Sequence, residues 1–239
     1  KNTIRTVAQF ELIYAFARLG QKLNAKIPEI VESGDIILKD ARHPLLLLQK
    51  EVVPLNLKLG DGYNTLLISG PNMGGKTCTL ETVALVSYMG LCGMPVTCEY
   101  ARIPHYKHIL VDEKDESTVT DELSTFGAHL LNLYEFAKMA DDKTLIIVDE
   151  IGRGTDPEDG SAIAMGFLEE FAKRGAHTFA SSHYNELKIF VENHPSMKNG
   201  AMLFECGKPT YKLLIGVQGA SCLLYTSDAA DEGLGVDLG

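Results

Sequence analysis

The sequence predicts an α/β fold in which helices flank a mixed, largely parallel sheet, with a helical stub at the N-terminus. Three observations support this prediction. The N-terminal residues carry apolar side chains at helical spacing, short continuous apolar runs follow residue 35, and helix-forming stretches separate several of these runs. Strands that alternate with helices are typical of a sheet whose faces are covered by helices.

The N-terminal stub covers residues 1–30 in our interpretation and continues from a region upstream of this chain. Its apolar positions recur every three or four residues, which places them on one face of a helix. Pro28 lacks the amide hydrogen that a continuing helix needs, so we expect Pro28 to stop the helix. The apolar positions are Ile4, Ala8, Leu12, Ala15, Leu19 and Leu23.

The second predicted unit covers residues 31–221 and holds the sheet. Continuous apolar runs such as Leu-Ile-Ile-Val indicate strands that are buried on both faces. We expect strands at residues 35–38, 65–69, 108–111, 145–148, 177–181 and 211–215, and helices at residues 76–91, 123–139 and 159–174. Residues 222–239 hold four acidic residues and no basic one, so we expect a tail that is disordered or foreign to the native protein.

The composition is that of a globular chain with an acidic balance. Of 239 residues, 45% are hydrophobic and 23% are charged, which is enough for a substantial core and is unlike a disordered chain. The formal net charge is −10, so this segment is a poor electrostatic partner for a nucleic-acid backbone. If nucleic acid is bound, we expect other parts of a longer protein to hold it.

Cysteine usage and hydropathy indicate a cytoplasmic protein that does not enter a membrane. The five cysteines are an odd number, and no two have the CxxC spacing, so we expect reduced thiols. No signal peptide precedes the first helix, and no apolar stretch approaches the roughly 20 residues that span a bilayer.

Residues 70–77 match the phosphate-binding pattern G-x-x-x-x-G-K-[ST] in full. A predicted strand precedes this P-loop and a predicted helix follows it, so its amides and the helix N-terminus can surround phosphate oxygens. We expect Lys76 to reach the β- and γ-phosphates of ATP and the Thr77 hydroxyl to ligate Mg²⁺. The alternative is a Gly-rich turn that binds nothing. The predicted binding residues are Gly70, Pro71, Asn72, Met73, Gly74, Gly75, Lys76 and Thr77.

Two acidic residues, Asp149 and Glu150, follow the apolar run at residues 145–148. Asp149, at the tip of a buried strand, is placed to hold Mg²⁺ through a water molecule. Glu150 is expected on the opposite side of the pleat, where it can accept a proton from the water that attacks the γ-phosphate. The alternative is a solvated acidic strand end. The pattern therefore predicts an ATPase in which Glu150, Lys76 and Mg²⁺ share the chemistry.

Five motifs, in the same order along the chain, resemble the ATPase domain of the MutS family. The resemblance covers roughly residues 35–221, which is most of the chain. The motifs are Ala-Arg-His-Pro-Leu at 41–45, the P-loop at 70–77, Leu-Ser-Thr-Phe at 123–126, Asp-Glu-Ile-Gly-Arg-Gly-Thr-Asp at 149–156 and Ser-His-Tyr-Asn-Glu-Leu at 182–187.

This resemblance implies an ABC-type ATPase that works as a homodimer, with each nucleotide held between two subunits. Ser124 would start a helix that contacts the γ-phosphate held by the partner chain. Asp156 would lie where the family's D-loop crosses the dimer interface, and His183 would sense the γ-phosphate. Without the family, Ser124 is also a good helix N-cap, and His183 is also compatible with a structural role.

Within the family, residues 155–160 and 208–216 look like the second bacterial branch rather than the branch that recognises mismatches. That branch is associated with branched DNA, restraint of recombination and, in some bacteria, stalled ribosomes, and many members carry a nuclease domain. The resemblance thus implies DNA binding mainly through domains outside this chain. Two departures stand out: residues 109–116 lack the glycine expected before the Ser-Thr-Phe segment, and the tail from Cys222 does not continue the family pattern.

Two other classes of protein share parts of this pattern. A transporter subunit of ABC type would carry Leu-Ser-Gly-Gly-Gln where this chain has Leu-Ser-Thr-Phe-Gly at residues 123–127. A nucleotide-gated binding module with little turnover remains open, although Glu150 argues against it. His105, His108 and Asp112 offer a weaker metal site, for which solvated histidines are the simpler interpretation.

Overall fold

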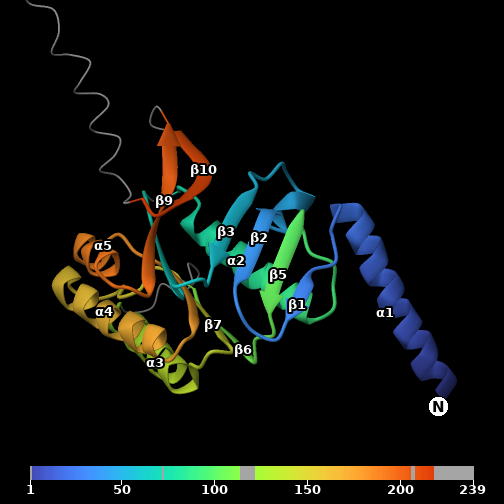
Figure 1. The fold of residues 1–239 in the computed structure, drawn as a ribbon, viewed down its shortest axis with the longest axis horizontal. Helices are drawn as coiled ribbons and strands as arrows, with labels where there is room; N and C mark the ends of the chain where they lie inside the picture. The colour runs from blue at the N-terminus through green and yellow to red at the C-terminus, as the bar shows by residue number, and fades with distance from the viewer. Residues whose placement is uncertain (1, 72, 114–121, 206–207, 218–239) are drawn as a thin grey trace, which may run out of the picture.

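The computed structural model describes residues 2–71, 73–113, 122–205 and 208–217. Within these ranges the chain forms two sheets with helices around them (Figure 1). The helices are α1 (Asn2–Leu23), α2 (Lys76–Leu91), α3 (Glu122–Met139), α4 (Pro157–Lys173) and α5 (Asn185–Glu192), together with the short 3-10 helix η1 (Leu46–Leu48). The strands are β1 (Glu29–Val31), β2 (Ile36–Ala41), β3 (Leu55–Leu59), β4 (Thr65–Ser69), β5 (Tyr100–Pro104), β6 (His108–Asp112), β7 (Thr144–Val148), β8 (His177–Ser181), β9 (Met197–Glu205) and β10 (Lys208–Ile215).

The larger sheet confirms the predicted α/β fold with a mixed, largely parallel sheet. Its strand order is β10-β9-β4-β8-β7-β6, and every pair is parallel except β10 with β9. Strand β8 lies between β4 and β7 and is parallel to both, so the carboxyl ends of these three strands meet at one edge of the sheet. Ligands of open α/β sheets bind at this edge.

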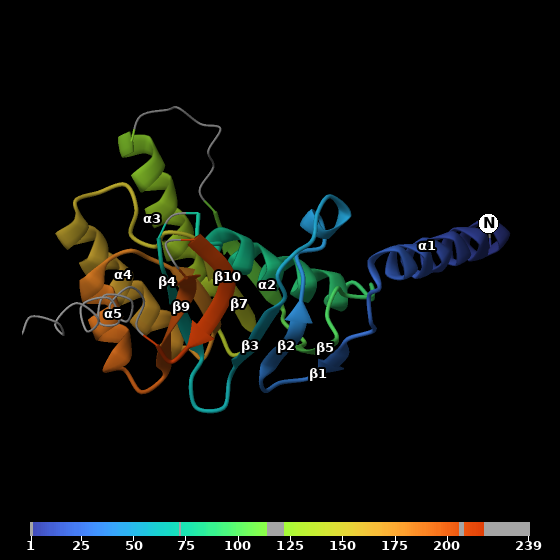
Figure 2. The same ribbon diagram turned by 90° about the horizontal axis from the view of Figure 1, so that it is seen from above.

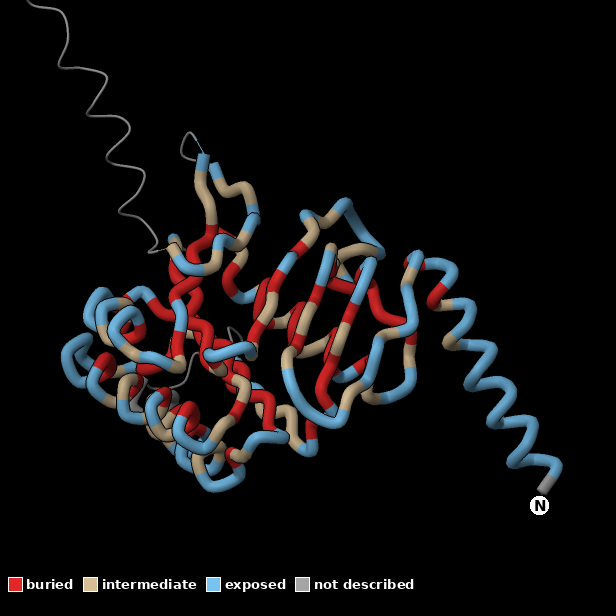
Figure 3. Tube along the Cα trace, in the orientation of Figure 1, coloured by how far each residue is buried: buried red, intermediate tan, exposed pale blue. Residues whose placement is uncertain are grey.

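The core lies on both faces of the six-stranded sheet, because successive side chains of a strand point to opposite faces. In β4, Leu66 and Ile68 pack on the face that is covered by α2 and the smaller sheet. Leu67 belongs to the opposite face, which α3, α4 and α5 cover with residues such as Leu133 and Leu168. Buried segments follow the central strands in Figure 3.

The smaller sheet was not predicted as a separate unit. Its order is β1-β5-β2-β3, with antiparallel pairs β2–β3 and β2–β5 and a parallel pair β1–β5. In β3, Leu55, Leu57 and Leu59 are buried whereas Asn56 is exposed. This alternation marks a half-buried strand, and a search for continuous apolar runs misses it.

Helix α1 forms the predicted N-terminal stub and projects away from both sheets (Figures 1 and 2). The expectation that Pro28 stops the helix is wrong, because the helix already ends at Leu23. Asn24 adopts a left-handed φ of 50°, and the next amide donates to the carbonyl of Gly20 at 2.8 Å, a common way to close a helix. Apolar side chains of α1 such as Phe10 remain exposed.

Candidate nucleotide-binding site

The P-loop leads from β4 into α2, as the sequence predicted. Lys76 is the first residue of α2, and its ammonium donates to the carbonyl oxygens of Gly70 at 2.7 Å and Pro71 at 3.2 Å. The amide of Gly74 also donates to Pro71 O at 3.2 Å. The loop therefore curls around its own lysine, which is buried.

The hairpin of β9 and β10 lies against the P-loop. Gly75 has a φ of +97°, and a Cβ added there would come within 3.1 Å of the Tyr211 ring. A Cβ added to Gly70 would come equally close to Met202. Glycine is therefore required at Gly75 by both its backbone conformation and its neighbour.

Thr77 and Asp149, the two predicted magnesium ligands, meet in the structure. Thr77 Oγ1 donates to Asp149 Oδ2 at 2.7 Å, and Ser181 Oγ from β8 donates to Asp149 Oδ1. Burial lowers the pKa of Lys76, while the nearby charges of Glu150 and Asp149 oppose this effect. A hydroxyl and a carboxylate are hard oxygen donors of the kind that Mg²⁺ prefers, so this pair fits the ion.

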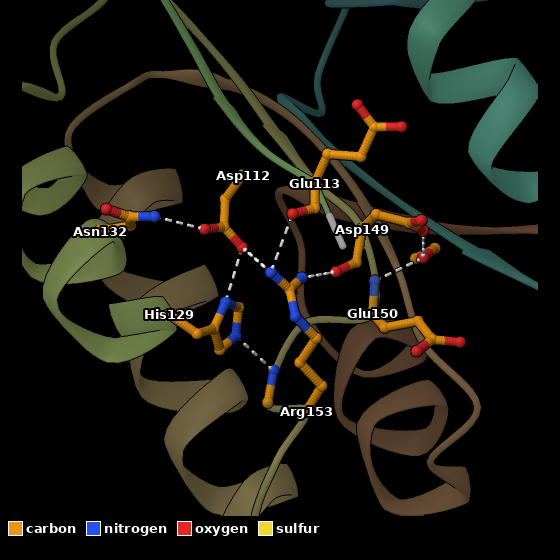
Figure 4. A network of polar contacts seen from close by, with 9 residues as sticks. Asp112, Glu113, His129, Asn132, Asp149, Glu150 and Arg153 are labelled. Carbon is orange, nitrogen blue, oxygen red and sulfur yellow. Dashed lines mark hydrogen bonds and ion pairs between the residues drawn. The ribbon is translucent and has the colours of Figure 1, made fainter. Parts of the chain in front are cut away.

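Residues 149–153, which we call the carboxylate loop, begin directly after β7. The pleat argument for Glu150 is wrong, because Glu150 lies beyond the strand and has a left-handed φ of 52°. Its amide donates to Ser181 Oγ at 2.8 Å, and its carbonyl accepts from the Arg153 amide at 3.1 Å. In Figure 4 the Glu150 carboxylate points away from Arg153.

A buried polar network beside the carboxylate loop escaped the sequence analysis (Figure 4). Asp112, the last residue of β6, contacts His129 Nδ1 at 2.6 Å and Arg153 Nη2 at 2.9 Å through Oδ2. Its Oδ1 accepts from Asn132 at 2.7 Å, and His129 Nε2 accepts from the Gly152 amide at 3.1 Å. The sequence offered one signal for this network, an acidic residue at the end of a strand parallel to β7. No motif relates the members of the network, because they lie far apart in the chain.

The three residues assigned through the family resemblance lie around the same edge. Asp156 caps α4, where its carboxylate accepts from the Glu158 amide at 3.1 Å. His183 follows β8 and is exposed, with its ring 4.5 Å from that of Tyr184. Ser124 lies in the first turn of α3, but its side chain and the whole of Asn72 fall outside the described part of the chain.

Two cavities flank the N-terminal half of α2. The first, of about 310 Å³, borders Gly75 and Thr79 and is walled by Val52, Val53 and Tyr211. The second, of about 330 Å³, borders Thr77 and Asp149 on the other side of the helix. Neither Asp156 nor His183 lines these cavities, although Ser182, next to His183, donates its amide to Ile68 O of β4 at 3.2 Å.

Acidic side chains line the second cavity. Burial, followed by the hydrogen bond and charge of Glu81, raises the pKa of Glu113 to about 7, and Asp149 adds to the effect. Glu81 in turn lies 3.2 Å from His43 Nε2, which comes from the motif upstream of the P-loop. Burial lowers the pKa of His43. The cavity next to Thr77 and Asp149 therefore combines several acidic side chains with apolar walls.

No group of three or more His, Cys, Asp or Glu residues in the described ranges is arranged to hold a metal, and His105 is exposed. Burial raises the pKa of the Cys78 thiol, which lies in the first turn of α2. Among the described residues, no helix is long and apolar enough to cross a bilayer.

Comparison with known proteins agrees with this geometry. Residues 66–223 match the family model described as MutS domain V. The chain is 40% identical, over 98% of its length, to an Endonuclease MutS2 from Caldicellulosiruptor saccharolyticus, of which it covers 29%. It is 38% identical, over 90% of its length, to an Endonuclease MutS2 from Enterococcus faecalis, of which it covers 28%.

The chain thus spans less than a third of the curated relatives that it matches. The matched segment contains the P-loop, the carboxylate loop and His183. Domain V is the ATPase domain of its family. This chain belongs to the MutS family, in its MutS2 branch.

Proposed function

We propose that this chain binds ATP with Mg²⁺ and hydrolyses it to ADP and phosphate, as the ATPase unit of a DNA-associated MutS-family protein. The observation that carries the proposal is the 2.7 Å contact between Thr77 Oγ1 and Asp149 Oδ2. It joins the P-loop to the carboxylate loop at the carboxyl edge of a parallel sheet, where such folds bind nucleotides.

The P-loop supplies the phosphate site. Its backbone amides and the N-terminus of α2 favour an anion, and the buried Lys76 brings a positive charge into the loop. Residues 70–77 would therefore hold the phosphates, with Lys76 at the β- and γ-phosphates. Thr77 and Asp149 would hold Mg²⁺, which offsets phosphate charge and fixes the orientation of the triphosphate when it is bound.

Glu150 is our candidate general base. It would take a proton from the water that attacks the γ-phosphate. Support comes from the left-handed backbone at Glu150, because strained non-glycine residues persist only where their surroundings hold them and are frequent at active sites. Ser181 holds the Glu150 amide and the Asp149 carboxylate together, so the two acids are oriented as one unit.

The cavity of about 310 Å³ beside Gly75 suits the nucleoside. Apolar walls from Val52 and Val53 and the half-exposed ring of Tyr211 would pack against a flat base. Replacing Tyr211 with alanine should weaken ATP binding about tenfold and leave binding of inorganic tripolyphosphate unchanged. Equal losses for both ligands would place the base elsewhere.

The remaining assignments follow from family membership. We propose a homodimer in which Ser124 and Asp156 of one chain face the nucleotide of the other and His183 senses the γ-phosphate. The ATPase unit would cover residues 31–221, with residues 1–30 as a helical connection and residues 222–239 as a tail outside the fold. DNA would be held mainly by other parts of a longer, cytoplasmic protein, because this chain carries a net charge of −10. Branched DNA, or a stalled ribosome, would be the target.

Phosphate release tests the proposal directly. We expect turnover in the presence of Mg²⁺, none in EDTA, and a loss of at least about 100-fold in Glu150→Gln with nucleotide affinity retained. The matched control is Glu169→Gln, which makes the same change on the exposed surface of α4. If Glu150→Gln turns over like the wild type, Glu150 is not the base. If the wild type binds ATP but releases no phosphate, the chain is a nucleotide-gated module.

A further inference from the structure

The carboxylate loop is held at every one of its amides. Asp149 donates to Asp112 O at 2.9 Å, and Ile151 donates to Ser181 O at 3.0 Å. Glu150, Gly152 and Arg153 complete the set. In that order, their amides donate to Ser181 Oγ, His129 Nε2 and Glu150 O. The strained conformation of Glu150 therefore depends on partners from β6, β8 and α3.

His129 is the partner that α3 supplies, and its protonation state follows from its two neighbours. The Asp112 carboxylate can only accept, so the hydrogen of His129 lies on Nδ1. The Gly152 amide can only donate, so His129 Nε2 is an unprotonated acceptor. A neutral imidazole with its hydrogen on Nδ1 satisfies both contacts, and an imidazolium does not.

Asp112 fixes this ring. Burial favours its neutral form, but hydrogen bonds from His129 and Asn132 and the charge of Arg153 outweigh burial and lower its pKa. The ionised carboxylate thus orients His129 on one side and holds Arg153 on the other. Arg153 also donates through Nη1 to the carbonyl of Asp149, which brings the proposed magnesium ligand into the same network.

We propose that His129 is a positioning residue for hydrolysis, because its Nε2 holds the Gly152 amide and thereby the backbone that carries Glu150. The inference rests on the proposed role of Glu150. His129 does not contact the reacting atoms; it acts through the carboxylate loop. A purely structural histidine would stabilise the fold through Asp112, whereas a positioning histidine matters through Gly152.

Two substitutions in the intact protein separate these contacts. His129→Gln keeps an acceptor near the position of Nε2 and loses the donor to Asp112. His129→Asn keeps a donor near the position of Nδ1 and loses the acceptor for Gly152. The matched control is Asn132→Leu, which removes another donor to Asp112 from the same helix without touching the carboxylate loop.

We expect His129→Asn to lower kcat by about 10- to 100-fold with nucleotide affinity unchanged, since small misplacement of a catalytic group slows turnover without weakening binding. His129→Gln and Asn132→Leu should stay within about threefold of the wild type. A normal kcat in His129→Asn would overturn the proposal. So would equal losses in all three variants, which would indicate a structural role.

Amide hydrogen exchange at residues 150–153 gives a readout that does not need turnover. Faster exchange in His129→Asn than in His129→Gln supports the link to Gly152, and equal exchange in both overturns it. A wild-type chain that releases no phosphate would instead sink the proposed function, and the exchange comparison would still decide whether His129 holds the loop.

Discussion

The P-loop and the carboxylate loop each place a non-glycine residue in the left-handed region, Met73 at 67° and Glu150 at 52°. Their surroundings differ. Met73 is 89% exposed in a loop that curls around its own lysine. Glu150 lies in a loop whose partners include Ser181 and His129, which are 23 to 32 positions from the groups that they hold.

This difference suggests a division of labour at the site. In the described part of the P-loop, Gly74 and Lys76 hydrogen-bond to carbonyl groups of the loop itself, whereas the carboxylate loop is held by side chains from β8 and α3. Groups that stabilise charge in a reaction work best when they do not reorganise. Substitutions in the carboxylate loop should therefore cost stability, and those in the P-loop should cost nucleotide affinity.

The largest expected effect is in the carboxylate loop, at Gly152. It has a φ of +83°, and a Cβ there would lie 2.3 Å from the carbonyl oxygen of Gly160, which is backbone and cannot move aside cheaply. We expect Gly152→Ala to lower the free energy of unfolding by on the order of 3 kcal/mol or more, as measured by urea unfolding. Gly166→Ala is the control, since an added Cβ meets nothing within 4 Å in α4, and it should be neutral or stabilising. Equal urea midpoints for Gly152→Ala and Gly166→Ala would contradict a rigid carboxylate loop.

Ser181→Ala removes the acceptor of the Glu150 amide and the donor to Asp149. The Glu150 amide and the buried Asp149 carboxylate then each lose a hydrogen-bond partner. We therefore expect the free energy of unfolding, measured in urea, to fall by about 1–3 kcal/mol. The buried Ser161 on α4 is the control, because its hydroxyl donates only within its own helix, to Glu158 O at 3.0 Å. A larger loss in Ser161→Ala would show that Ser181 does not anchor the loop.

The P-loop counterpart is Lys76→Met. Burial lowers the pKa of Lys76, so the folded state carries its charge at a cost, and removing the charge should change the free energy of unfolding by less than about 1 kcal/mol. Nucleotide affinity should fall by about 100-fold, because a charge at the phosphates is lost. A variant that is strongly destabilised but still binds ATP would reverse the comparison between the two loops.

The smallest expected effect is a pH dependence next to the carboxylate loop. The pKa of Glu113 is raised from 4.5 to about 7, first by burial and then by Glu81. The folded chain thus holds a proton that the unfolded chain releases, and this stabilising contribution is present below about 4.5 and lost as the pH rises through 7. Glu81→Gln removes the charge that repels the Glu113 carboxylate. It should raise the free energy of unfolding by less than about 1 kcal/mol near pH 8 and by little near pH 5. The exposed Glu99 provides the control substitution. An equal gain at both pH values would exclude this coupling.

What the sequence could predict follows the same division. The P-loop and α2 were predicted correctly because their signals are local: a pattern of eight residues between an apolar strand and a helix-forming run. The buried strand before Asp149 was equally clear, since residues 145–148 of β7 form a continuous apolar run. The contact of Thr77 with Asp149 confirms that the two motifs meet, although their roles in binding and hydrolysis stay predictions.

The missed features depend on distant residues or on alternation. No spacing rule joins Asp112 to His129, because their contact requires β6 and α3 to be packed first. The left-handed backbone of Glu150 also arises from the partners around it. Strand β3 was missed because polar residues alternate with its buried leucines. Pro28 was wrongly chosen as the end of α1 because Asn24 closes the helix earlier.

We propose that the P-loop and the carboxylate loop bind one magnesium–nucleotide complex together, through Thr77 and Asp149. Calorimetric titration with ATP, in Mg²⁺ and in EDTA, tests it most directly when wild type is compared with the near-isosteric Asp149→Asn. We expect Mg²⁺ to strengthen ATP binding by at least about tenfold, or 1.4 kcal/mol, in the wild type and by much less in Asp149→Asn. Equal enhancement by Mg²⁺ in both proteins would contradict it.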